Sequence, residues 1–179
     1  MTALAAPTAL HTISLLVRNK PGVLVRIALV FSRRGYNIDS CVVSPAFDAE
    51  IEGYRAETGE FSRMTITCSG DPENLEQIVK QLEKLIDVVH AIDHTGQAVI
   101  ECELLLVKIR VAIDARTAIL QIAETSHAKV VDYGADSLIL RCAGEGGKLD
   151  ALVALLKPHG IIELVRSGKI LMARGQATT

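Results

Sequence analysis

The sequence predicts an α+β protein built from two βαββαβ modules in tandem. Three observations support this prediction. Strand-like and helix-like segments follow the same order twice, the helical segments carry apolar residues at i, i+3, i+4 and i+7, and the pattern pauses near residues 95–97. The chain has 179 residues, of which 49% are hydrophobic, enough for two small packed domains. The order of elements is that of the ferredoxin-like fold.

The first module is expected at residues 11–95. It opens with an apolar, β-rich strand at residues 11–18. Asn19 is expected to cap a helix that runs to about Arg34, with Val23, Leu24, Ile27 and Phe31 on its inner face. The remaining elements are strands at 36–44, 61–69 and 87–94, a helix that begins at Asp71-Pro72, and a long acidic loop at Ala46–Glu60.

The second module is expected at residues 96–175. A long strand at 100–111 precedes a helix that we expect Asp114 to cap. A hairpin follows at 130–133 and 137–142, then a helix from Gly147 that Pro158 and Gly160 end, and strands at 161–166 and 169–172. Residues 1–10 are an N-terminal extension, and residues 176–179 are a tail.

The pattern also predicts oligomerisation. A four-stranded sheet with both helices on one side leaves its other face bare, and a second copy is the commonest cover for such a face. Val25 and Leu29 form a second apolar patch on the first helix, which suits a subunit contact.

Composition argues against several classes of function. The net charge is −2 with both signs interspersed, and no basic patch suggests nucleic-acid binding. The four cysteines lack a C-x-x-C pair and lie in apolar segments, so we expect reduced, buried thiols. With no signal-peptide pattern and no apolar run of membrane-spanning length, we expect a cytoplasmic protein without a membrane segment.

We find no convincing catalytic or metal-binding constellation in the sequence. His90 and His94 lie at a strand end, where residues four apart are too widely separated to hold one ion. Glu101 and Glu103 are expected to be solvated charges at the edge of a strand. The Gly144–Lys148 segment lacks the spacing and the hydroxyl residue of a phosphate-binding loop.

The most distinctive segment is the turn after the first strand. A helix N-terminus suits a carboxylate, and Gly22 lets a ligand approach the backbone. Asn19 and Asn37 offer amides for an ammonium or a carboxylate, and apolar side chains complete a pocket for a small apolar α-amino acid. The candidate residues are Asn19, Gly22, Val23, Leu24, Asn37 and Ile38. An ordinary glycine turn with a capping asparagine is the alternative.

Asn-Lys-Pro-Gly-Val-Leu at residues 19–24, on a strand-to-helix turn, resembles the ACT domain, an amino-acid-sensing unit. Longer runs are similar to the small regulatory subunit of acetohydroxyacid (acetolactate) synthase. They lie at residues 31–40, 62–66 and 75–88, and at 105–109, 147–151 and 166–168 in the second half. The resemblance covers residues 11–175 and implies an N-terminal ACT domain followed by an ACT-like C-terminal domain.

The resemblance implies a regulatory rather than a catalytic protein. In that family a separate catalytic subunit carries thiamine diphosphate, Mg²⁺ and FAD, so no cofactor is expected in this chain. The small subunit activates the catalytic subunit in branched-chain amino acid biosynthesis. It often confers feedback inhibition by valine, leucine or isoleucine, bound between two ACT domains of a homodimer. The motif assigns the six candidate residues to that effector site.

The chain departs from the family pattern in the Ala46–Glu60 loop, which looks longer and more acidic than usual. This loop lies where it would alter contacts with the catalytic subunit or access of the effector. The alternative function is a free-standing ACT sensor that regulates another enzyme or transcription.

Overall fold

The computed structural model describes residues 9–47, 50–51, 54–55, 57, 59–112, 115–175 and 179. The chain divides into two compact units. The first extends to Ile100 and also takes the residues from Leu171 onward, and the second is Glu101–Ile170. Residues 96–100 and 171–175, expected in the second module, therefore group with the first. Within the first unit, Arg63 Nη1 donates a hydrogen bond to the carbonyl oxygen of the C-terminal residue Thr179.

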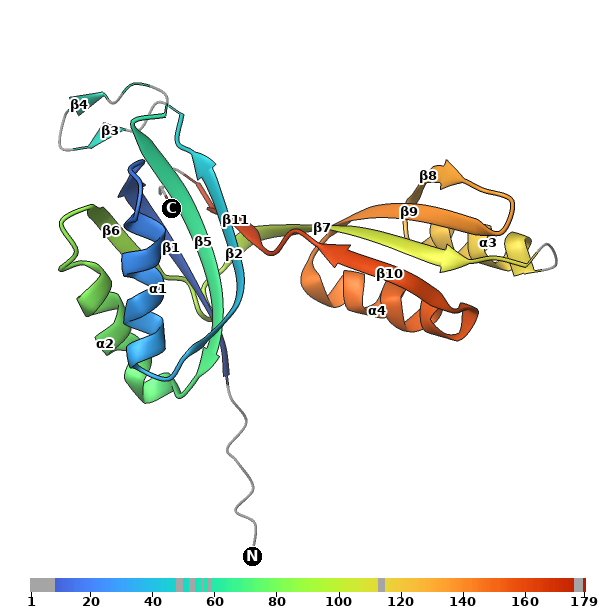
Figure 1. Ribbon diagram of the computed structural model, residues 1–179, viewed down its shortest axis with the longest axis horizontal. Helices are drawn as coiled ribbons and strands as arrows, with labels where there is room; N and C mark the ends of the chain where they lie inside the picture. Colours follow the sequence, from blue (N-terminus) through green and yellow to red (C-terminus); the bar gives the residue numbers. More distant parts are fainter. Residues whose placement is uncertain are drawn as a thin grey trace, which may run out of the picture. The chain divides into compact units, whose positions relative to one another are not determined.

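The first unit is a four-stranded antiparallel sheet with two helices on one face (Figure 1). The strand order is β2-β5-β1-β6, which leaves β2 and β6 at the edges. Its elements are β1 (Ala9–Arg18), α1 (Val23–Arg33), β2 (Asn37–Pro45), β5 (Phe61–Gly70), α2 (Pro72–Leu82) and β6 (Val88–Asp93).

The Ala46–Glu60 loop, for which the sequence predicts no regular structure, contains a short hairpin. In this hairpin β3 (Glu50–Ile51) pairs with β4 (Tyr54–Arg55). The prediction missed it because two-residue strands are too short to show periodicity. The other positions of the loop between residues 48 and 58, apart from residue 57, lie outside the described residues.

The core of the first unit lies between the sheet and its helices. Alternate residues of β1 and β5 meet helix residues spaced three and four apart, as the two periodicities require. Leu24, predicted on the inner face of α1, is instead 49% exposed, because the helix turns it past the edge of the buried stripe. The core includes Ile13, Leu15, Val17, Val23, Ile27, Phe31, Met64, Ile66, Cys68, Leu75, Ile78 and Leu82.

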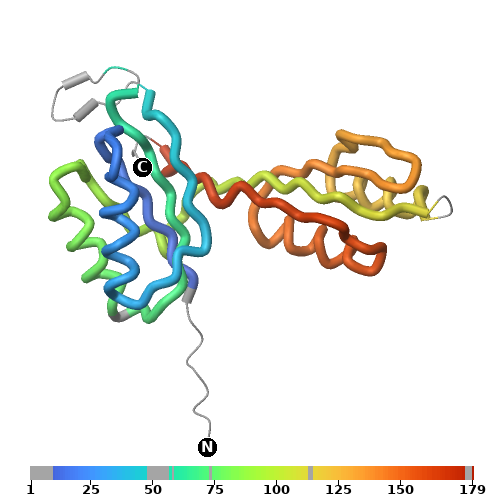
Figure 2. Tube along the Cα trace, viewed as in Figure 1, coloured from blue at the N-terminus to red at the C-terminus, as the bar shows by residue number. Residues whose placement is uncertain are grey.

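The second unit repeats the arrangement (Figures 1 and 2). Its strand order is β10-β7-β9-β8, with β11 also pairing with β7. The elements of this unit are β7 (Val99–Arg110), α3 (Arg116–Thr125), β8 (Lys129–Tyr133), β9 (Ser137–Gly144), α4 (Gly146–Leu156) and β10 (Ile161–Arg166). The last strand, β11 (Ile170–Ala173), pairs with β7, but its residues from Leu171 onward group with the first unit. The predicted fold class, two ferredoxin-like modules in tandem, is confirmed. The expected cap at Asp114 lies outside the described residues.

The cysteines do not all lie in the core as expected. Cys68 and Cys142 are buried, Cys102 is half-buried and Cys41 is exposed. Cys41 is exposed because it lies on β2, an edge strand without a neighbour on one side. Burial raises the pKa of the Cys68 thiol to about 12, with smaller contributions from Asp39 and Asp93.

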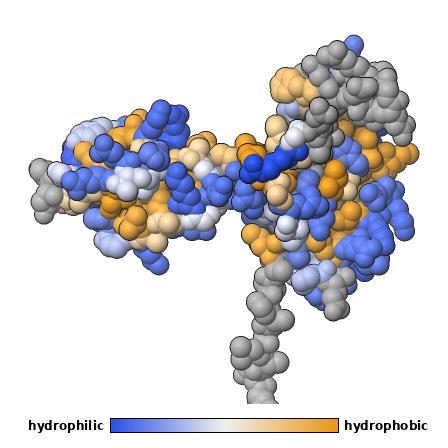
Figure 3. Space-filling model, turned by 180° about the vertical axis from the view of Figure 1, so that it is seen from behind, coloured by the Kyte–Doolittle hydropathy of each residue, from blue (hydrophilic) through white to orange (hydrophobic). Residues whose placement is uncertain are grey.

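The surface mixes apolar and polar residues in small patches, as Figure 3 shows for one side of the molecule. Within the described residues, no helix is both long enough and apolar enough to cross a membrane.

Candidate functional site

The turn between β1 and α1 is hydrogen-bonded to residues 59–60, which are distant from it in sequence. The Asn19 side-chain amide donates a hydrogen bond to the Gly59 carbonyl oxygen over 2.9 Å, and the Asn19 backbone N–H donates to the Glu60 carbonyl oxygen over 2.9 Å. The prediction that Asn19 caps the helix is therefore wrong. The N-cap position is Gly22, which has no side chain to offer.

Gly22 adopts a left-handed conformation, with φ of +84°, that favours glycine. Among the described residues, a Cβ at this position would meet only the Arg26 Nη1 atom, 3.4 Å away, and no other described atom lies within 4 Å of it. In the described part of the chain, the backbone N–H groups of Leu24 and Val25 have no hydrogen-bond partner. The turn thus offers free donors at the positive end of the helix dipole.

Arg26 adds a full positive charge beside this turn. Its Nη2 atom forms an ion pair with the Asp87 carboxylate, whose residue is only 9% exposed. The Asp87 carbonyl oxygen also accepts a hydrogen bond from the Arg18 N–H over 2.8 Å. Asp87 therefore fixes both the end of β1 and the guanidinium group. Sequence reasoning missed Arg26, although its place one helical turn after Gly22 was a signal.

The three apolar candidate residues, Val23, Leu24 and Ile38, differ in how far they are buried. Val23 is 4% exposed and belongs to the core. Leu24 is half-exposed beside the turn, and Ile38 is partly buried and packs against the core from the start of β2. Of these three described residues, Leu24 alone presents a substantial apolar surface next to Gly22.

Asn37 lies at the opposite end of the module from Gly22. Arg18 pairs with Phe61 on β5, whereas Asn37 pairs with Ser69, eight residues further along that strand. Eight residues of antiparallel strand span about 26 Å. The structure brings Asn19, Gly22 and Leu24 together at one end of the first unit, and Asn37 and Ile38 at the other.

The polar surroundings of Asn37 are well defined. Its side-chain N–H donates to the Asp39 carboxylate over 2.7 Å, and the Ser69 hydroxyl donates to the same oxygen over 3.3 Å. This arrangement leaves the Asn37 side-chain carbonyl oxygen as an exposed acceptor beside a carboxylate. An ammonium group is the ligand that suits such a pair.

The residues considered for catalysis have structural roles. His94 Nε2 lies 2.8 Å from the Ser14 hydroxyl, and the described residues contain no cluster of three metal-ligating side chains. Glu101 and Glu103, expected as solvated charges, are ion-paired. Lys169 Nζ lies 2.7 Å from Glu101, and Arg166 Nη2 lies 2.7 Å from Glu103.

Comparison with known proteins places both units in one group. Residues 13–90 match the family model "AHAS small subunit-like ACT domain", and residues 102–175 match "Small subunit of acetolactate synthase". The chain is 39% identical over 165 residues to the acetolactate synthase small subunit of Mycobacterium bovis, covering 92% of each protein. It is 40% identical over 168 residues to that of Mycolicibacterium smegmatis, covering 94% of this chain and 93% of the relative.

A solved structure supports the same grouping. The crystal structure of the acetolactate synthase small subunit from Thermotoga maritima superposes with a TM-score of 0.77 at 32% sequence identity. The superposition covers 94% of this chain and 99% of that one. The likeness therefore extends over both units.

Proposed function

Because the chain belongs to the acetolactate synthase small-subunit family, we propose that it activates a catalytic subunit and lets a branched-chain amino acid inhibit that subunit. The observation that carries the proposal is the open turn at Gly22, with its free N–H groups and Arg26, in a module that matches an ACT domain. Catalysis belongs to the partner, where we place thiamine diphosphate, Mg²⁺ and FAD. This chain's part is to bind the effector and to couple that binding to activity.

We place the effector between two copies of the first unit. In one copy, the position that pairs with Arg18, next to the Gly22 turn, and the position that pairs with Asn37 are about 26 Å apart along β5, whereas an extended residue spans roughly 3.5 Å. One amino acid therefore cannot contact both groups of the same copy. If both groups bind one effector, they must come from different copies.

The edge strand β2 suits such a dimer. In a two-fold arrangement, antiparallel pairing of two β2 edges sets the Asn37 end of one copy beside the Pro45 end of the other. The Pro45 end lies near the Gly22 turn, since Pro45 pairs with Ser62 and Arg18 pairs with Phe61. The exposed apolar residues Leu24, Val25 and Leu29 of α1 provide further contact area.

The proposed effector contacts follow from charge. The effector carboxylate binds the N–H groups of Leu24 and Val25 and faces Arg26, while Asn19 holds the turn in place. The ammonium group binds the Asn37 carbonyl oxygen of the other copy. Leu24, with Ile38 of the other copy, contacts the branched side chain. The carboxylate and the ammonium group are thus bound by different copies, so binding stabilises one arrangement of the dimer.

The test of the function measures acetolactate formation by the cognate catalytic subunit, with and without this chain, across a valine titration. Stimulation that valine reverses is expected, with an inhibition of roughly 5- to 150-fold, the usual range for allosteric coupling. Leucine and isoleucine titrations identify the effector. No stimulation of the catalytic subunit would contradict the proposal and favour a free-standing ACT sensor.

Replacing Asn37 with alanine is expected to weaken effector binding by roughly tenfold or more, because a hydrogen bond to a charged ammonium is lost. Isothermal titration calorimetry with the three branched-chain amino acids measures the change. Asn74→Ala is the matched control, since Asn74 is also an exposed asparagine bonded to a nearby aspartate. An affinity unchanged by Asn37→Ala would remove Asn37 from the site.

A further inference from the structure

The second unit leaves one face of its sheet without helices. Leu105, Val107 and Ile109 of β7 point into the core, so Leu104 and Leu106 point the other way. We call this other side the outer face. It is formed by Leu104, Leu106, Lys108 and Arg110 of β7, Ile139, Arg141 and Ala143 of β9, Glu163 and Val165 of β10, and Lys129 and Asp132 of β8.

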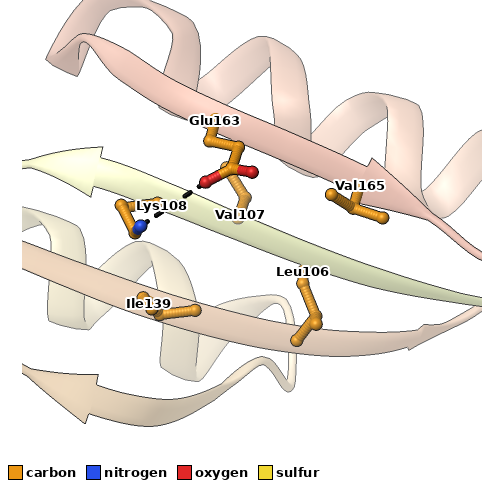
Figure 4. Close-up of a pocket in the computed structure, with 6 residues that line it drawn as sticks. All are labelled: Leu106, Val107, Lys108, Ile139, Glu163 and Val165. Carbon is orange, nitrogen blue, oxygen red and sulfur yellow. Dashed lines mark hydrogen bonds and ion pairs between the residues drawn. The ribbon is translucent and has the colours of Figure 1, made fainter.

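The centre of the outer face is apolar and hollowed. Leu104, Leu106 and Val165 are 42%, 39% and 54% exposed, and they lie on neighbouring strands. A hollow of about 150 Å³ lies among Leu106, Ile139 and Val165 (Figure 4). The figure shows the Lys108–Glu163 ion pair, 3.4 Å long, beside it. Exposed leucine and valine side chains around a hollow are typical of a surface that binds another protein.

Positive charge is concentrated on one side of this apolar centre. Lys129 and Arg141 lie directly opposite each other on β8 and β9, a like-charge pair that destabilises the sheet. Within the described residues neither side chain forms an ion pair. A second hollow, of about 380 Å³, is lined by both, with His127, Leu104 and Ala143, and none of these residues is acidic. A carboxylate from another molecule would relieve the repulsion between Lys129 and Arg141.

We propose that the outer face docks the catalytic subunit, through a segment that carries apolar side chains flanked by carboxylates. This inference rests on the proposed function, which supplies the partner. The face has four cationic side chains against two carboxylates, a net charge of +2. A second copy would bring the same positive charge against itself, whereas an acidic partner neutralises it. The apolar centre then supplies the buried contact and the cations supply orientation.

Charge reversal of Lys129 and Arg141 tests the proposal in the reconstituted complex. The Lys129→Glu/Arg141→Glu variant is expected to raise the concentration needed for half-maximal activation at least tenfold at low salt. The wild-type value should rise with ionic strength, whereas the variant value should fall, because salt screens attraction in the first case and repulsion in the second. The matched control is Lys148→Glu/Lys157→Glu, which makes the same change of charge at exposed positions on and just after α4.

A second variant tests the apolar centre independently. Leu106→Ser should also raise the half-maximal concentration, while Leu155→Ser, at an exposed leucine of α4, should not. Circular dichroism melting shows whether each variant is folded.

If wild type activates and the outer-face variants activate at the same concentration, the docking surface is overturned and the proposed function stands. If the variants instead dissociate a small-subunit oligomer in sedimentation, a second copy occupies the face and the inference is wrong. Failure of wild type to activate would overturn the proposed function itself.

Discussion

Gly22→Asp is expected to abolish feedback inhibition while leaving activation of the catalytic subunit intact. The new carboxylate would lie next to Arg26 Nη1, which is 3.4 Å from the Cβ position, and next to the free N–H groups of α1. It would occupy the place of the effector carboxylate and repel it. We expect the inhibition constant for the effector to rise by about 100-fold or more, equivalent to about 2.7 kcal/mol or more. Acetolactate formation across an effector titration measures this.

Gly22→Asn separates charge from backbone strain in that experiment. Asparagine has nearly the shape of aspartate and tolerates a left-handed conformation to a similar degree, but it carries no charge. It should therefore lose less affinity for the effector than Gly22→Asp. A Gly22→Asp protein that remained fully sensitive would exclude the turn as the effector site. Equal losses in both variants would show that steric blocking, rather than charge, is responsible.

Gly70→Ala is expected to destabilise the first unit by roughly 1–3 kcal/mol, the usual cost of overpacking a core. A Cβ at Gly70 would lie 2.6 Å from two ring carbons of Tyr36. Tyr36 cannot move aside freely, because it is 6% exposed and its hydroxyl donates a hydrogen bond to the Asp71 carbonyl oxygen. Urea unfolding followed by circular dichroism measures the free energy of unfolding.

A double-mutant cycle assigns the cost of Gly70→Ala to the ring. In a Tyr36→Ala background the space is open, so the same substitution should cost much less. Gly147→Ala is a control of opposite sign. Gly147 lies in α4, and no atom of the described residues lies within 4 Å of its Cβ position, so alanine should stabilise the helix by about 0.5–1 kcal/mol. Equal costs of Gly70→Ala in both backgrounds would contradict the steric explanation.

Local signals were sufficient to predict the order of the elements apart from the β3–β4 hairpin. Asp71-Pro72 begins α2 as the residues indicate, and the apolar stripe of α1 faces the sheet. Features that depend on distant partners could not be predicted. Asn19 bonds to Gly59, forty residues away, instead of capping the helix next to it. Glu103 is paired with Arg166, sixty-three residues away, so its charge is neither solvated nor free.

The candidate site shows the same limit. The sequence predicted that Gly22, through its backbone, and Asn37, through its side-chain amide, belong to one amino-acid site. It could not show that the two positions lie at opposite ends of the sheet, because that separation follows from the register of β1 and β2 on β5. Arg26 was missed for a related reason, since its role depends on Asp87, which anchors it from the turn before β6.

The grouping of the residues after Ile170 with the first unit makes that unit discontinuous in sequence. A fragment that stops near residue 95 or 100 would therefore be an incomplete domain. Arg63 would lose its bond to Thr179, and the hollow shared by Phe47, Leu171 and Met172 would lose one wall. Excising residues 101–170 and joining the two remaining segments with a short flexible linker would keep Leu171, Met172 and Thr179 in the protein, but β11 would lose most of β7, the strand with which it pairs. Effector sensing by the ACT unit alone is best measured in that internal deletion.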